Sequence, residues 1–362
     1  MTREILLVGS VPLQPAARVF ETVAKYLGPS APCIPDGEQI GWLQAAFKSF
    51  AAHPHLEVNR HVPLDAGGRI PLAIYRLKPG VSPSDFRLGP YGYADNAIRS
   101  YQQFRQLRDE GKIPAGTRMQ VTMPGPGTSA YVIELAAEQL LPIARAALAR
   151  EIESIVAAIP ASDLAIQLDI AMEAEHEEYL RRPDAWDQPM HKVFHWTLEQ
   201  MADSAAWLAQ RVPGQAELGL HICSIWHHDT GAGQDNQVLV DAANAILSRV
   251  ERPVNYLHIP VIPEHVQSDY EVLRSLKLGS GTRLYLGLIN LADGLDGARR
   301  RIAMAEKVVP EFGVAMFCGL GRAPGAAGPS GTLAHAVVPA LRRATPDTIG
   351  AVLELHREIA NL

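Results

Sequence analysis

The sequence predicts an α/β fold, and among such folds it favours one (β/α)8 barrel, a TIM barrel, spanning residues 1–362 as a single domain. Two observations carry this prediction. Short apolar runs alternate with stretches of helical spacing, and eight such runs can be counted. Polar and metal-ligand residue types gather where the runs end, which is where the active face of a barrel lies. A doubly wound open sheet is the alternative, but no Gly-x-Gly-x-x-Gly follows the first run.

The first part of the chain supplies two strands and two helices. The apolar run at residues 4–9 is too short for the core of a signal sequence, and it is typical of a buried strand. Helical spacing of apolar residues follows at 15–27. A second short strand, 32–35, leads into the acidic turn Asp36-Gly37-Glu38, and a helical stretch at 42–50 comes next.

Residues 54–92 break this alternation. They are rich in proline and glycine and hold one strand-like piece, 72–77, so an inserted loop or hairpin is expected. A helix at 96–110 resumes the pattern. The remaining strands are expected at 118–123, 164–170, 217–223, 255–261, 284–289 and 313–318, and the helices at 130–158, 192–212, 236–250, 268–276 and 295–309. A run rich in alanine, glycine and proline at 323–332 is expected to form a loop over the barrel mouth.

Composition excludes several classes of partner. The 362 residues are 47% hydrophobic and 20% charged, as in ordinary globular enzymes. A net charge of −6 argues against general binding to nucleic acid or anionic membranes. The sequence contains no run of 18 apolar residues, the length that would predict a membrane span. Three widely spaced cysteines suit a reducing cytoplasm, with thiols serving as ligands or core filler. A small-molecule partner is therefore expected.

The run ending in His221-Ile222-Cys223 carries two metal-ligand residues. In a strand they project to one face about 6–7 Å apart, which one zinc ion can bridge with bonds of about 2.0–2.3 Å. The run at 313–318 ends in a further cysteine, Cys318. A core role without metal is the alternative for such a pair. Cys33 has no ligand-type neighbour in sequence and is expected to be a buried hydrophobe.

Further polar candidates lie in the segments after two strands. His228 follows Cys223 with Trp226 nearby, and an imidazole there could act as a general acid or base while the indole contacts substrate. The acidic run 173–178 is expected to be a solvated helix start, with Glu173 alone kept as a pocket candidate. The pair His191 and His195 has helical zinc spacing, but helix-surface histidines are commoner.

Five motifs stand at strand ends in this order: Val8-Gly9-Ser10, Asp36-Gly37-Glu38, Ile166-Gln167-Leu168-Asp169, His221-Ile222-Cys223 and Cys318-Gly319-Leu320-Gly321-Arg322. In this order they resemble the catalytic domain of cobalamin-independent methionine synthase, and more closely the short, single-barrel methionine synthase II-like proteins. The resemblance covers nearly the whole chain. It implies that zinc bound by His221, Cys223 and Cys318 activates a substrate thiol, and that Ser10, Glu38 and Asp169 bind the amino acid part of the substrate.

One position departs from that family. Its fourth zinc ligand is a glutamate at the end of the sixth strand, and here Pro260 takes that place. His258, two residues earlier on the same face, is the tentative replacement, and Glu264 is another candidate. A site without metal, or with three ligands and an open position, stays open as well.

The leading function implied by the resemblance is a zinc-dependent methyl or alkyl transferase acting on a thiol or a small methylated metabolite, including demethylation. Because the folate-binding half of the family is absent, the methyl donor would be free or delivered by a partner protein; a homo-oligomer also stays open. One alternative is a metal-independent lyase or decarboxylase of the uroporphyrinogen decarboxylase type, in which the histidines and Asp169 do acid–base work. A non-catalytic binder of small molecules is the other.

Overall fold

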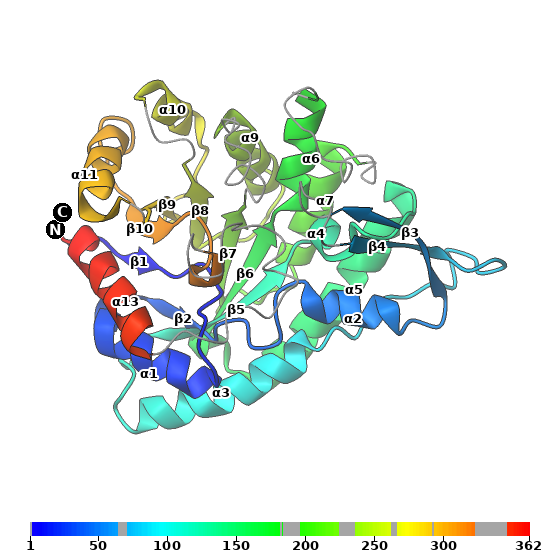
Figure 1. Cartoon of the computed structure of the whole chain (residues 1–362), viewed down its shortest axis with the longest axis horizontal. Coiled ribbons are helices and arrows are strands. Elements are labelled where there is room, and N and C mark those ends of the chain that lie inside the picture. Colours follow the sequence, from blue (N-terminus) through cyan, green and yellow to red (C-terminus); the bar gives the residue numbers. More distant parts are fainter. Residues whose placement is uncertain are drawn as a thin grey trace.

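Eight parallel strands form a nearly closed barrel surrounded by helices in the computed structural model (Figure 1), which confirms the predicted fold class. The structure describes residues 2–63, 71–181, 183, 196–223, 236–261, 266–291, 293–322 and 346–362. The strands follow the order β1-β10-β9-β8-β7-β6-β5-β2. Among the described residues no ladder joins β1 to β2, so these two strands border a seam in the barrel wall.

The barrel strands are β1 (Ile5–Leu6), β2 (Cys33–Pro35), β5 (Arg118–Pro124), β6 (Leu164–Ile170), β7 (Glu217–Ile222), β8 (Tyr256–Pro260), β9 (Arg283–Ile289) and β10 (Gly313–Met316). The longer helices are α1 (Ala16–Leu27), α2 (Gln44–Ala51), α3 (Tyr93–Asp109), α5 (Ala137–Ala158), α6 (Met172–Arg181), α7 (Leu198–Ala209), α9 (Asn236–Leu247), α11 (Gly294–Ala305) and α13 (Pro346–Ala360). Short helices are α4 (Pro126–Ala130) and α10 (Ser268–Glu271). These bounds lie close to the predicted strands, although β1 is shorter than the run at 4–9.

The barrel interior changes character along the strands. A separate buried cluster fills it, made of Leu6, Val8, Cys33, Ala165, Tyr256, Tyr285 and Ala315. Gly219 makes room for one of the two tyrosines, because a Cβ there would lie 2.0 Å from the Tyr256 ring. Since alternate residues face inward, the same rows continue toward the carboxyl ends of the strands with Asp169, His221 and His258. The floor of the barrel is therefore packed, and its upper end is polar.

The excursion at 54–92 contains an antiparallel hairpin, β3 (Leu56–Pro63) and β4 (Pro71–Leu77), which projects from one side of the barrel (Figure 1). This confirms the predicted insertion. Helix α5 confirms most of the helix predicted at about 130–158 but begins later, at Ala137, because residues 131–136 separate it from the short helix α4. Tyr75 of β4 explains the break: its N–H donates to Val132 O at 2.8 Å, and its carbonyl accepts from Glu134 N at 2.8 Å.

The acidic start of α6 is not solvated, so that expectation is wrong. His176 is 3% exposed and Glu178 is 2% exposed. The His176 ring packs edge-on against Trp196, with ring centroids 6.1 Å apart, so this face of the helix turns toward neighbouring elements. His191, His195 and the predicted mouth loop at 323–332 lie outside the described residues.

The two ends of the described chain lie side by side (Figure 1). Helix α13, which the sequence patterns did not single out, packs against α1, and Arg3 N donates to Ala360 O at 2.8 Å. Among the helices of the described ranges, none combines the length and apolar character that crossing a membrane requires.

Candidate metal centre

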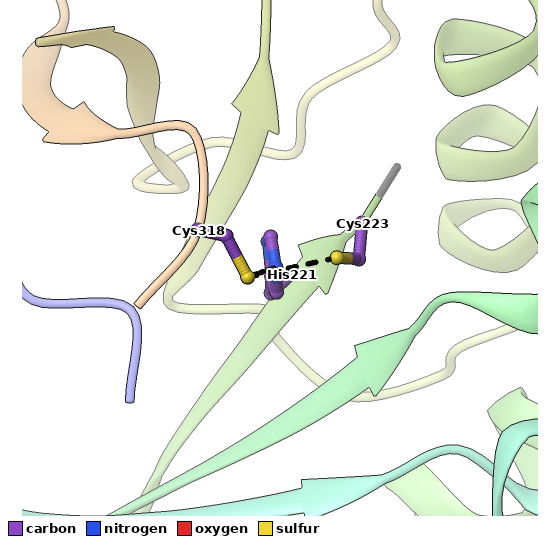
Figure 2. A group of neighbouring side chains, drawn as sticks. All are labelled: His221, Cys223 and Cys318. Carbon is purple, nitrogen blue, oxygen red and sulfur yellow. Dashed lines mark hydrogen bonds between the residues drawn. The ribbon is translucent and has the colours of Figure 1, made fainter. Parts of the chain in front are cut away.

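Three potential metal ligands converge at the carboxyl end of the barrel (Figure 2). His221 belongs to β7, Cys223 directly follows that strand, and Cys318 lies two residues beyond β10. All three are buried, and one ligand atom from each lies within 4.8 Å of the others. Cys223 is held in place because its N–H donates to Ile170 O at 2.8 Å.

Two of the three spacings between these atoms are close to those around one tetrahedral zinc ion. The two cysteine Sγ atoms lie 3.8 Å apart, and Cys318 Sγ lies 3.9 Å from His221 Nε2. Around zinc, bonds of about 2.3 Å to sulfur and about 2.0 Å to nitrogen place two sulfurs roughly 3.8 Å apart and sulfur and nitrogen roughly 3.5 Å apart. Neither cysteine forms a disulfide within the described residues. The set of one imidazole and two thiols is therefore able to hold zinc.

His258, the tentative fourth ligand, has both ring nitrogens in hydrogen bonds. Its Nδ1 lies 2.7 Å from His221 Nδ1, and its Nε2 lies 3.0 Å from Met316 O. Burial, and then the proximity of His221, holds its pKa well below the usual range, so the ring is neutral. In this arrangement His258 supports His221 and is not among the three clustered ligands. Pro260 ends β8, and Glu264 lies outside the described residues.

Ser10 lies against the segment that follows Cys318. A Cβ on Gly319 would lie 2.1 Å from Ser10 Oγ and 2.7 Å from Ser10 N, so only glycine permits this approach. Gly321 N donates to Ser10 O at 3.3 Å. The Ser10 hydroxyl has no hydrogen-bond partner within the described ranges, which leaves it available to a ligand. The structure thus brings Ser10 beside the cysteine side of the trio.

Glu38 is held in an uncommon backbone conformation, with φ of +57°. Its N–H donates to Asp36 Oδ1 at 2.9 Å, and Asp36 Oδ2 accepts from Asn96 Nδ2 at 2.6 Å and Ser100 Oγ at 2.7 Å. Burial raises the pKa of Asp36. A Cβ on Gly9 would lie 2.6 Å from Glu38 Oε1, so the carboxylate packs directly over the loop that leads to Ser10.

A small cavity adjoins Glu38. Its volume is about 20 Å³, room for roughly one water molecule. Thr122 was not among the residues predicted from the sequence. Its buried Oγ1 has no hydrogen-bond partner in the described part of the chain and would lie 3.2 Å from a Cβ on Gly9. Alternation along β5 could have found it, because Thr122 shares the inward row of Gln120. The cavity is lined by Asp36, Glu38, Ile40, Gly41, Trp42, Tyr93, Asn96, Ala97, Val121 and Thr122.

Asp169 lies beside His221, since the two residues are register partners on β6 and β7. It is 2% exposed and accepts from Gln167 Nε2 at 2.8 Å. The same amide donates to Val8 O at 2.5 Å, and Gln120 Nε2 donates to Leu7 O at 3.0 Å. These amides tie the polar row to the end of β1 across the seam.

Glu173 has a structural contact network of its own. Its Oε1 accepts from Thr128 N at 3.0 Å, and its other oxygen accepts from the Thr128 hydroxyl. Thr128 Oγ1 in turn accepts from Ala171 N and Met172 N. Burial raises the pKa of Glu173. The carboxyl therefore fastens α4 to α6, and its pocket role stays a prediction. The other two candidates, His228 and Trp226, lie outside the described residues.

No protein-family model matches the sequence, and no match was found among curated proteins. The structure is similar to a B12-independent methionine synthase from Shewanella sp. W3-18-1, solved in complex with selenomethionine. The TM-score is 0.54 at 13% sequence identity, with 100% of this chain and 98% of that chain covered. The likeness shows a shared fold.

Proposed function

We propose that this protein is a zinc-dependent methyl or alkyl transferase acting on a thiol or a small methylated metabolite. The buried trio of His221, Cys223 and Cys318, spaced for one tetrahedral ion, carries the proposal. The similar fold of a methionine synthase supports methyl transfer as the reaction class. We also propose that residues 1–362 form one catalytic domain, which receives its methyl donor free or from a partner protein.

The three ligands fit a catalytic zinc site better than a structural one. Structural sites are closed by four protein ligands, whereas catalytic sites keep one position open. Pro260 supplies no ligand atom where a carboxylate is expected, and His258 is engaged elsewhere. A neutral imidazole and two thiolates would balance the charge of Zn²⁺. An incoming thiolate would then meet a neutral centre.

Zinc bound there would lower the pKa of a coordinated substrate thiol, so that the thiolate predominates near neutral pH. The remaining groups bind and orient the substrate. The Ser10 hydroxyl can donate to an anionic group, while the carboxylates of Glu38 and Asp169 attract a cationic one. Burial of the trio excludes water, which strengthens these interactions.

The first experiment measures zinc by elemental analysis in protein purified without added metal. About one zinc per chain is expected, and Cys223→Ser or Cys318→Ser should each lower the zinc content and the rate of methyl transfer to a thiol. Cys33→Ser is the matched control. Cys33 is buried in the barrel floor, and burial raises the pKa of its thiol to about 12, so it stays protonated. Absence of zinc, with full activity in both ligand variants, would refute the proposal.

Two observations favour a second candidate, a metal-independent lyase or decarboxylase. The position of the carboxylate ligand is taken by Pro260, and the hydrogen-bonded pair of His221 and His258 lies beside Asp169. This candidate predicts carbon dioxide release from a carboxylated substrate at a rate that a zinc chelator does not change. A chelator-sensitive rate would favour the transferase.

A further inference from the structure

His258 connects the two strands that carry the clustered ligands. Its Nδ1 lies 2.7 Å from His221 Nδ1 on β7, and its Nε2 lies 3.0 Å from the carbonyl oxygen of Met316 on β10. Met316 precedes Cys318 by two residues. The His258 ring is fully buried, so neither contact competes with solvent.

The carbonyl of Met316 fixes the proton positions. A carbonyl oxygen only accepts hydrogen bonds, so His258 Nε2 must carry a hydrogen. His221 can bind metal through Nε2, the nitrogen that faces Cys318, only when that atom carries no hydrogen, so the hydrogen between the two Nδ1 atoms belongs to His221. His258 Nδ1 is therefore the acceptor, and His221 Nδ1–H donates to it. A neutral His221 then carries its lone pair on Nε2, the atom 3.9 Å from Cys318 Sγ.

The backbone of β10 is shaped to offer that carbonyl. The pairing of β10 with β9 shifts register between Ala315 and Met316, as in a β-bulge. A bulge releases backbone groups from the regular ladder and redirects them. Gly287 of β9 permits the close approach, because a Cβ there would lie 2.8 Å from Phe317 Cα and 3.2 Å from Met316 O.

We propose that His258 is a positioning residue of the metal centre: it holds His221 in the tautomer whose Nε2 can bind metal, and it ties the Cys318 segment to the same ring. The inference rests on the proposed centre at His221, Cys223 and Cys318. The family's glutamate binds zinc directly. In this chain a histidine close to that position would instead orient another ligand, His221. Mutation of a residue that hydrogen-bonds a metal ligand typically lowers metal affinity by about 10–100-fold.

The test is zinc affinity of the full chain, measured by competition with a chromophoric chelator. His258→Leu removes the acceptor facing His221, and the dissociation constant should rise about 10–100-fold. His258→Asn places an amide oxygen near the position of Nδ1, so most of the affinity should return. The visible spectrum of the cobalt(II) form provides a second readout, because its bands report ligand geometry. Melting of the metal-free proteins shows whether each variant is folded.

The outcomes separate this inference from the proposed function. A wild-type chain that binds no zinc would overturn the metal centre and the inference together. Zinc binding by the wild type with equal affinity in His258→Leu would overturn the inference alone. Should His258→Leu not fold, His258→Gln replaces it, since glutamine reaches toward Met316 but loses the acceptor facing His221. Equal affinities of His258→Gln and His258→Asn would again overturn the inference.

Discussion

Three buried histidines, His221, His258 and His356, show at the scale of single residues how a hydrogen-bond partner decides what an imidazole can do. The pair in the barrel shares one hydrogen bond, which leaves a nitrogen of His221 for metal. In α13, His356 Nδ1 donates to Val352 O at 2.8 Å, and its buried Nε2 has no hydrogen-bond partner within the described residues. The same side chain is thus a ligand candidate in one place and a packing residue in another.

The burial of His356 predicts that acid lowers the stability of the folded protein. Burial lowers its pKa from 6.5 to about 4, so the neutral ring is favoured in the folded state. Between these two values the unfolded chain binds the extra proton, so stability falls as the pH drops from 6.5 toward 4, by at most about 3 kcal/mol from this group. His356→Phe should flatten the melting temperature across this range. Parallel wild-type and variant curves would contradict the prediction.

The sequence predicted that His221, Cys223 and Cys318 would meet at one end of the barrel, because a two-residue spacing and the ends of two apolar runs are local signals. Their proposed role as zinc ligands came from the resemblance to methionine synthase. The hydrogen bonds of His258 could not be predicted from such local signals. Met316 lies 58 positions further along the chain, and its carbonyl becomes available through a register shift that leaves no mark in composition. Thr122 was missed although its alternation was visible, because a lone threonine in a strand is usually packing.

At the scale of elements, an inward-facing glycine on one strand makes room for a large side chain on the neighbouring strand. Gly219 of β7 faces Tyr256 of β8, and the tyrosine hydroxyl reaches Gln167 Oε1 at 3.4 Å. Apolar runs predicted the barrel strands well, because each buried strand needs such a run. The break between α4 and α5 was not predictable, since it depends on hydrogen bonds to the hairpin more than fifty residues away.

Gly219→Ala should therefore destabilise the barrel floor. The added Cβ would lie 2.0 Å from the Tyr256 ring, and overpacking of this kind costs about 1–3 kcal/mol. The measurement is the free energy of unfolding in urea. Gly116→Ala is the matched control, because a Cβ there meets nothing within 4 Å. A stability equal to that of the control would mean that the tyrosine moves aside freely.

At the scale of the whole molecule, the candidate site brings together segments that lie far apart in the sequence. The loop leading to Ser10 packs on Gly319, while His221 and Cys318 are 97 positions apart in sequence. A bound ion would cross-link β7 to β10 and favour the folded state, because the unfolded chain does not hold these ligands together.

Removal of metal should therefore lower the melting temperature of the wild type. At a free zinc concentration a hundred times the dissociation constant, the stabilisation expected from binding is about 2.7 kcal/mol. Calorimetry before and after chelation, with zinc then restored, measures this. The Cys318→Ser variant should respond much less. A wild type that melts at the same temperature in all three states would contradict the prediction.

The seam between β1 and β2 has a consequence for the width of the substrate site. Ser10 follows β1 and Glu38 follows β2. The two candidate substrate contacts therefore lie on opposite sides of the seam, where no backbone ladder joins the strands in the described structure. The amides of Gln120 on β5 and Gln167 on β6 donate to Leu7 O and Val8 O, just beyond β1. Side-chain packing across the seam therefore contributes to the distance between the two contacts, and we expect substitutions there to change the width of the substrate site.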